Sequence, residues 1–214
     1  MITRDLDFFL EDGRQELPPS VKAKEVRCTL ALPKSNLPGL DYALNPYVGC
    51  EHGCLYCFAP DVVKRERSDW ATLVGYRSNL PVALSRELRS KRGAIGIGTV
   101  TDPYQPLEAV LLLTRKCLME LCRHDNSISI LTKSDLVLRD LELIQATKGP
   151  EVGITVTCTE EALAKVLEPG APPPRRRFAA LGKLSRAGMN CYAMIGPVLP
   201  FLEPEDLTAI LDEV

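Results

Sequence analysis

Three cysteines, Cys50, Cys54 and Cys57, lie within a stretch of eight residues with the spacing Cys-x3-Cys-x2-Cys. Gly49 and Gly53 beside them allow tight turns of the backbone, so three thiolates can converge on one soft-metal centre. A structural zinc ion normally takes four protein ligands, usually as two separated pairs, and no second such pair follows. An iron–sulfur cube held by three cysteines leaves one iron free to bind a substrate or cofactor. The spacing therefore favours a catalytic iron–sulfur cluster.

At these residues the sequence resembles the radical S-adenosylmethionine (SAM) enzymes, whose signature is Cys-x3-Cys-x-aromatic-Cys, with Tyr56 as the aromatic. The stretches NPY at 45–47 and TVTDPYQP at 99–106 resemble the spore photoproduct lyase-like branch of that superfamily, the DNA repair photolyase-like proteins. The resemblance runs from about residue 42 to the C-terminus. It implies a [4Fe-4S] cluster, SAM as cofactor, and reductive cleavage of SAM to a 5′-deoxyadenosyl radical that abstracts hydrogen from a substrate.

The resemblance also assigns residues to the two cofactors. In the lyase family a Ser-Asp pair after the second strand, a Thr-Lys pair after the third and a serine on the fourth contact SAM. The implied cofactor-binding residues here are Tyr56, Thr101, Asp102, Lys133 and Thr155. The implied metal ligands are Cys50, Cys54 and Cys57. No motif identifies a catalytic residue beyond these.

The chain departs from the lyase at the position of its hydrogen donor. The lyase has a cysteine two residues before its SAM-contacting serine, whereas this chain has Thr99, whose O–H bond is too strong for that role. Phe58 also stands where the lyase has a tyrosine. These differences argue against repair of thymine dimers, and Cys158 or Tyr104 stay open as other donors. The substrate is unidentified, nucleic acid remains one class of candidate, and an electron donor such as flavodoxin or ferredoxin is implied.

Short apolar runs alternate with longer amphipathic runs, which is typical of a parallel sheet with helices outside it. We expect an α/β fold, a partial (β/α)6-type TIM barrel of the radical SAM fold shortened at the C-terminus, with residues 1–40 as a lead-in segment and 41–214 as the core domain. Strands are expected at 41–48, 94–100, 127–131, 152–157 and 190–195, and helices at 81–91, 107–123, 136–147, 160–167, 175–187 and 204–214. The site residues then follow the strands at one mouth of the barrel. Phe8, Phe9 and Leu10 could form a strap across its outside.

Composition limits the partners. The 26 basic and 28 acidic residues give a net charge of −2, which provides no overall attraction to nucleic acid or anionic lipid. No stretch approaches the roughly 20 apolar residues of a membrane span and no signal peptide is apparent, so we expect a soluble, cytoplasmic protein without membrane contact. The oligomeric state is not indicated. The five cysteines outside the cluster motif lie in apolar runs and are expected to be reduced.

Several features allow two interpretations. Glu168 and Arg177 could orient a polar substrate or form an ion pair that fixes a loop. The basic residues at 64–92 and 175–177 could contact phosphates or be solvated helix faces. A zinc-binding interaction or nucleic-acid module could use the three cysteines with Cys28 or His52. A truncated, inactive relative that holds a cluster without turnover is the other alternative.

Overall fold

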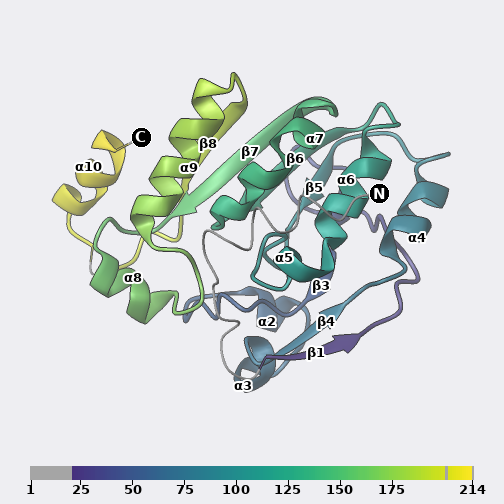
Figure 1. Ribbon diagram of the computed structural model, residues 1–214. Helices are drawn as coiled ribbons and strands as arrows, with labels where there is room; N and C mark the ends of the chain where they lie inside the picture. Colours follow the sequence, from purple (N-terminus) through teal and green to yellow (C-terminus); the bar gives the residue numbers. More distant parts are fainter. Residues whose placement is uncertain (1–20, 201, 214) are drawn as a thin grey trace.

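The computed structural model describes residues 21–200 and 202–213, and its largest element is a five-stranded parallel sheet (Figure 1). The strand order is β2-β5-β6-β7-β8, so successive strands of this sheet are neighbours along the chain. Its members are β2 (Tyr42–Leu44), β5 (Ile95–Ile97), β6 (Ser127–Thr132), β7 (Lys148–Val156) and β8 (Asn190–Ile195). Parallel neighbours require crossover connections, and here these contain helices. The predicted α/β partial barrel is confirmed.

The helices that follow the strands come in chain order. They are α4 (Leu80–Glu87), α5 (Glu108–Leu111), α6 (Leu113–Leu121), the 3-10 helix η1 (Asp135–Asp140), α7 (Leu141–Gln145), α8 (Glu161–Leu167), α9 (Pro174–Arg186) and α10 (Pro204–Asp212). Helix α9 begins with proline, which needs no hydrogen-bond partner in a first turn. Within the described part of the chain, no helix combines the length and apolar character that crossing a membrane requires.

A second, three-stranded sheet corrects the prediction of one strand at 41–48. It has the order β1-β4-β3, with β1 (Lys22–Glu25), β4 (Leu73–Tyr76) and β3 (Tyr47–Val48). Pro46 lies between β2 and β3, and proline cannot donate a hydrogen bond to a neighbouring strand. The chain therefore leaves the main sheet there, and β3 pairs antiparallel with β4. Two short helices, α2 (Ala59–Val62) and α3 (Arg67–Trp70), separate these strands.

Two helix predictions were wrong in continuity. The helix expected at 107–123 is interrupted at Leu112, which has a left-handed φ of 56°. The Glu108 carboxylate accepts the backbone N–H groups of Thr114 (2.9 Å) and Arg115 (3.1 Å), which stabilises a new helix start. The helix expected at 136–147 begins as the 3-10 helix η1, capped by the hydroxyl of Ser134. These contacts depend on side chains that hydrophobic periodicity does not register.

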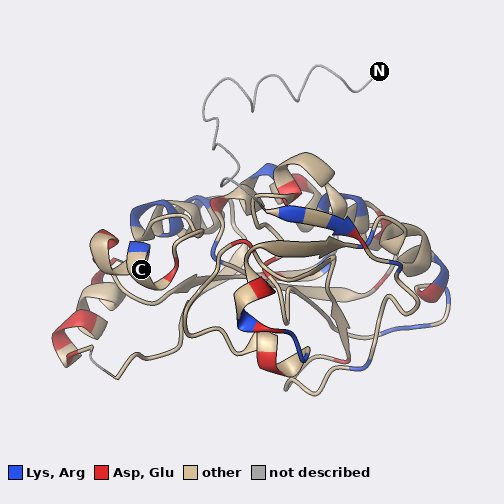
Figure 2. Cartoon of the chain, turned by 90° about the horizontal axis from the view of Figure 1, so that it is seen from below, with Lys and Arg blue, Asp and Glu red and all other residues tan. Residues whose placement is uncertain are grey.

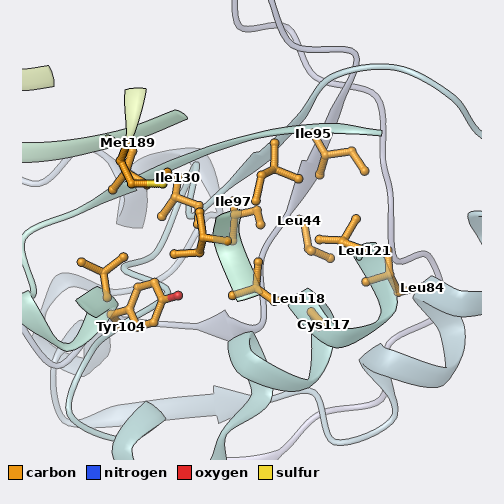
Figure 3. Packing of buried hydrophobic residues seen from close by; sticks show 14 of the residues in the cluster. Leu44, Leu84, Ile95, Ile97, Tyr104, Cys117, Leu118, Leu121, Ile130 and Met189 are labelled. Carbon is orange, nitrogen blue, oxygen red and sulfur yellow. The ribbon is translucent and has the colours of Figure 1, made fainter. Parts of the chain in front are cut away.

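The main core lies between the sheet and the helices on its outer side. Figure 3 shows Leu44, Ile97 and Ile130 from the strands packing near Leu118 and Leu121 of α6. All five are nearly inaccessible to solvent. Burial of aliphatic side chains at this interface contributes about 1.5–3 kcal/mol each to folding. The sheet is thereby held rigid beneath the loops that follow its strands.

The described part of the segment before β2, residues 21–41, packs against the rest of the fold. Ala31 and Leu32 are fully buried, and their N–H groups donate to the Glu87 carboxylate at 2.7 and 3.1 Å. The strap expected from Phe8, Phe9 and Leu10 lies outside the described residues. Figure 2 shows basic and acidic segments interspersed over the visible elements, in keeping with the small net charge.

Candidate functional site: the cysteine loop and the strand ends around it

The cysteine loop (residues 49–58) follows β3 and is fixed at its start by a glycine. Gly49 has a φ of +98°, a value that side chains disfavour. A Cβ atom there would lie 2.9 Å from the carbonyl oxygen of Leu73 and 3.0 Å from Nη1 of Arg65. Cys50 then donates its N–H to the Trp70 carbonyl at 3.2 Å. The backbone of the loop is therefore held against the small sheet and α3.

The three thiols of the loop are free and lie within electrostatic reach of one another. Burial raises the pKa of Cys50 well above its ordinary value, and negative charge at Asp102 and Cys54 adds to the rise. Burial raises the pKa of Cys54 to about 11, against the lowering effect of the Lys133 charge. The Cys50 and Cys54 thiols are therefore neutral until a positively charged partner favours their thiolates.

The thiols do not converge on a single point. Among the described residues, no three His, Cys, Asp or Glu side chains are grouped closely enough to hold one metal ion. A preformed tetrahedral zinc site brings its sulfurs to about 3.8 Å from one another, as Zn–S bonds of 2.3 Å require. Of the two fourth ligands considered for zinc, Cys28 packs in the main core, apart from the buried residues around Cys50, and His52 directs Nδ1 to Asp102 at 3.3 Å. The geometry gives the zinc alternative no support.

Asp102, which follows β5, is a hydrogen-bonding centre of the site. Its carboxylate accepts from the hydroxyl of Thr132 (2.7 Å) and the backbone N–H of Lys133 (2.8 Å), both at the end of β6. Nδ1 of His52, in the cysteine loop, lies 3.3 Å from Oδ2. Burial opposes ionisation of Asp102, but the charge and hydrogen bond of His52, with the other donors, lower its pKa to about 2. The charged carboxylate thus joins two strand ends to the loop.

Thr101 and Gln105 attach the loop after β5 to the start of the cysteine loop. The Thr101 hydroxyl donates to the Gly49 carbonyl at 2.7 Å, and Nε2 of Gln105 donates to that hydroxyl at 3.2 Å. The N–H of Glu51 donates to Oε1 of Gln105 at 2.9 Å. Gln105 is fully buried, and sequence reasoning missed its role. Its position within TVTDPYQP was the available signal.

Tyr56 and Lys133 meet at a second buried carboxylate, Glu168. The Tyr56 hydroxyl donates to Glu168, and Nζ of Lys133 lies 3.9 Å from Oε1 of Glu168. The Lys133 ammonium also lies over the Tyr56 ring, 5.5 Å from its centre. Its side chain is 15% exposed, so the charge can reach a bound molecule. Thr155 ends the group as a buried residue of β7.

Glu168 and Arg177 form the loop-fixing ion pair, the second of the two interpretations considered. Each residue is 1% exposed, and the two side chains contact each other directly. Arg177 also donates to the carbonyls of Pro172 (2.7 Å) and Thr155 (3.3 Å). The ion pair and the bonds from Arg177 to the two carbonyls hold the turn between α8 and α9 against β7. It is not placed to orient a substrate.

The candidate hydrogen donors occupy different surroundings. Tyr104 is fully buried in the main core. Cys158 is buried after β7, and its thiol donates weakly to the carbonyl of Glu160 at 3.7 Å. Thr99 accepts a hydrogen bond from the Asn45 side chain at 2.9 Å, which joins the ends of β2 and β5. The contacts of Thr99 are those of a structural residue.

The family model of the radical SAM superfamily matches residues 44–214, which include the cysteine loop and all five strand ends. The chain belongs to the radical SAM superfamily. Relatives include an uncharacterised protein of Methanocaldococcus jannaschii, 37% identical over 78% of this chain and 64% of its own length. An uncharacterised protein of Mycobacterium tuberculosis is 35% identical over 89% of this chain and 60% of its own length. The chain therefore spans less than two thirds of the length of these relatives.

Solved structures of spore photoproduct lyase share the fold. A mutant of that enzyme superposes with a TM-score of 0.68 at 17% identity, over 89% of this chain and 57% of the lyase. A complex of the lyase with dinucleoside spore photoproduct gives a TM-score of 0.66 at 16% identity, over 89% and 57% of the two chains. The superposition establishes that this radical SAM protein shares the partial-barrel fold. At identities this low it says nothing about the substrate.

The residues of the radical SAM site fit an iron–sulfur cluster. The loop offers three free cysteine thiols, whose thiolate form is the ligand type of such clusters, and they are not grouped as one ion would need. Nε2 of His52 is buried and has no hydrogen-bond partner among the described residues, although the other ring nitrogen faces Asp102. This nitrogen is a polar atom of the loop that no group of the described chain satisfies. The loop therefore offers the ligand type that such a cluster needs.

Proposed function

We propose that this protein is a radical SAM enzyme that holds a [4Fe-4S] cluster on Cys50, Cys54 and Cys57 and cleaves SAM reductively. The observation that carries the proposal is one loop with three free thiols, joined at Gly49 and His52 to the residues that follow β5. Membership of the superfamily supports it. When bound and reduced, such a cluster supplies the electron that splits SAM into methionine and a 5′-deoxyadenosyl radical.

The residues around the loop have defined tasks in this proposal. The Lys133 ammonium, which lies over the Tyr56 ring, provides a positive charge for the carboxylate of SAM. Thr101 and Asp102 keep the loop in register with β5 and β6. Thr155 offers a hydroxyl at the end of β7, beside the same mouth. Together they orient the cofactor and limit the access of water to it.

The test is anaerobic reconstitution of the purified protein with iron and sulfide. We expect about four irons per chain, as in a [4Fe-4S] centre, and formation of 5′-deoxyadenosine when SAM and dithionite are added. Cys50→Ala, Cys54→Ala and Cys57→Ala should each lose the iron. Cys122→Ser, which changes a partly exposed thiol at the end of α6, should keep it. Iron uptake without SAM cleavage would support the inactive-relative alternative, and zinc binding without iron would contradict the proposal.

For the substrate we propose nucleic acid as the first class to test, with a flavodoxin or ferredoxin as the electron donor. The fold match to a lyase crystallised with a dinucleoside photoproduct motivates this choice. With a net charge of −2, contacts to phosphates would have to be local. The protein is incubated with unlabelled SAM and deuterated oligonucleotides, and the mass of the 5′-deoxyadenosine is then measured. Deuterium in that product shows that hydrogen was taken from the oligonucleotides. Unlabelled product would exclude the oligonucleotides tested.

A further inference from the structure

The end of α8 and the turn that follows it contact the cysteine loop at three points. The N–H of Leu55 donates to the carbonyl of Leu167 at 2.9 Å, and the N–H of Gly170 donates to the carbonyl of His52 at 3.0 Å. The Tyr56 hydroxyl donates to Glu168 between these two bonds. More than one hundred residues of chain separate the two sides. The contact is therefore tertiary, and groups of the chain make all three of its bonds.

The close approach is possible because position 170 has no side chain. A Cβ atom on Gly170 would lie 2.1 Å from the Glu51 carbonyl oxygen and 3.1 Å from Cα of His52. A Cβ on Gly53 would lie 3.1 Å from the Ala71 side chain and 3.7 Å from Pro169. Backbone thus packs directly on backbone, a geometry that glycine alone allows.

Residues outside the cysteine loop also bind the Glu168 carboxylate and fix its position. The Thr157 hydroxyl donates to Oε1 at 2.9 Å, and the Arg177 guanidinium pairs with the carboxylate. Lys133 adds a second positive charge at 3.9 Å. Burial raises the pKa of Glu168, but the charges of Arg177 and Lys133, followed by the hydrogen bonds from Arg177 and Tyr56, lower it overall. A charged, buried carboxylate forms strong hydrogen bonds, and the bond from Tyr56 is of this kind.

We propose that Glu168 is a positioning residue that locks the cysteine loop, through Tyr56, in its ligand-presenting conformation before any metal binds. Tyr56 lies between Cys54 and Cys57, so fixing its ring fixes the backbone that carries both thiols. The lock lowers the ordering cost of cluster assembly. It also keeps the Lys133 ammonium over the Tyr56 ring. This inference rests on the proposed cluster function, because only that function requires the loop to present its thiols.

Two matched variants distinguish the effect of the Tyr56–Glu168 hydrogen bond on the loop from the effect of losing any one donor to Glu168. Tyr56→Phe removes the hydroxyl that joins the loop to Glu168 and leaves the ion pair with Arg177 in place. Thr157→Val removes the other hydroxyl that donates to the same oxygen, but Thr157 follows β7 and does not belong to the loop. Both changes delete one donor to Glu168. Only the first should release the loop.

The first measurement is amide hydrogen exchange of the metal-free protein at Leu55 and Gly170. In Tyr56→Phe these amides should exchange at least about tenfold faster than in the wild type, because a lost hydrogen bond to a buried charge changes a local opening equilibrium by that much. In Thr157→Val the exchange rates of the same amides should stay within about threefold of the wild type, because the contacts between the loop and residues 167–170 are intact. Equal rates in the two variants would overturn the proposal.

The second measurement is anaerobic iron uptake and the electron paramagnetic resonance spectrum of the reduced protein. Tyr56→Phe should take up iron more slowly and give a broader spectrum, since the ligands sample more than one arrangement, while Thr157→Val should match the wild type. A wild type that takes up no iron would refute the proposed function. A wild type that takes up iron normally, beside a Tyr56→Phe variant with unchanged uptake, spectrum and amide exchange, would refute the role of Glu168 alone.

Discussion

Nδ1 of His52 lies 3.3 Å from Oδ2 of Asp102, and this contact joins the cysteine loop to the end of β5. The same carboxylate binds the Thr132 hydroxyl and the Lys133 N–H at the end of β6. One ionised group therefore sets the relative positions of three segments that are far apart in sequence. A buried charge can do this only when several donors compensate the loss of hydration.

We expect Asp102→Ala to destabilise the protein by about 3–5 kcal/mol, because it leaves the buried donors of His52, Thr132 and Lys133 without their shared acceptor. The free energy of unfolding of the metal-free protein, measured in urea, is the readout. Asp125→Ala removes an exposed carboxylate and is the control. A loss below about 1 kcal/mol, the typical scale for a surface charge, would mean that Asp102 does not organise the site.

Lys133→Met should weaken the binding of SAM to the reconstituted protein by roughly tenfold to one hundredfold, the usual cost of losing a charge-assisted hydrogen bond. The methionine keeps an unbranched apolar side chain and loses the ammonium that lies over the Tyr56 ring. Equilibrium binding of SAM under anaerobic conditions measures the change. Lys183→Met, on the exposed side of α9, should bind SAM as the wild type does. Unchanged affinity in Lys133→Met would remove this residue from the cofactor site.

The main sheet and the location of the site could be predicted from sequence because both follow from local patterns. The run NCYAMI was expected as a strand at 190–195, and β8 has those bounds. The stretch TVTDPYQP follows β5 of the parallel sheet, and the cysteine loop follows its neighbour β2 after the short strand β3, which brings the two to one edge. No knowledge of distant contacts was needed for these inferences.

The rest depends on contacts between distant residues. Continuous helical periodicity hides the break at Leu112, which the carboxylate of Glu108 stabilises by capping α6. The small sheet forms because Pro46 ends the pairing of β2 and β3 finds β4. The link from Tyr56 to Glu168 spans more than half of the chain and has no local signal. Such pairings become visible only once the fold brings the residues together.

Gly49→Ala should destabilise the metal-free protein more than Gly188→Ala does. Both positions have positive φ, at +98° and +73°, so both variants carry a backbone penalty of about 1 kcal/mol. Only at Gly49 would the new Cβ meet the carbonyl oxygen of Leu73, at 2.9 Å, whereas nothing lies within 4 Å at Gly188. Urea unfolding should show an additional loss of about 1–3 kcal/mol in Gly49→Ala. Equal losses would indicate that the loop moves freely to admit a side chain.

Glu87→Gln should lower the stability by about 1–2 kcal/mol at pH 7, since the carboxylate accepts the N–H groups of Ala31 and Leu32 and pairs with Lys91 at 2.7 Å. Burial opposes ionisation of Glu87, but these three partners lower its pKa below the ordinary value. A lowered carboxyl pKa stabilises the fold above the unfolded-state value of about 4.3, and the contribution is lost as the pH falls through the folded-state pKa. The gap in unfolding free energy between wild type and variant should therefore be full at pH 7 and narrow below about pH 4. A gap that is the same at both pH values would show that the segment before β2 is held by packing of Ala31 and Leu32 alone.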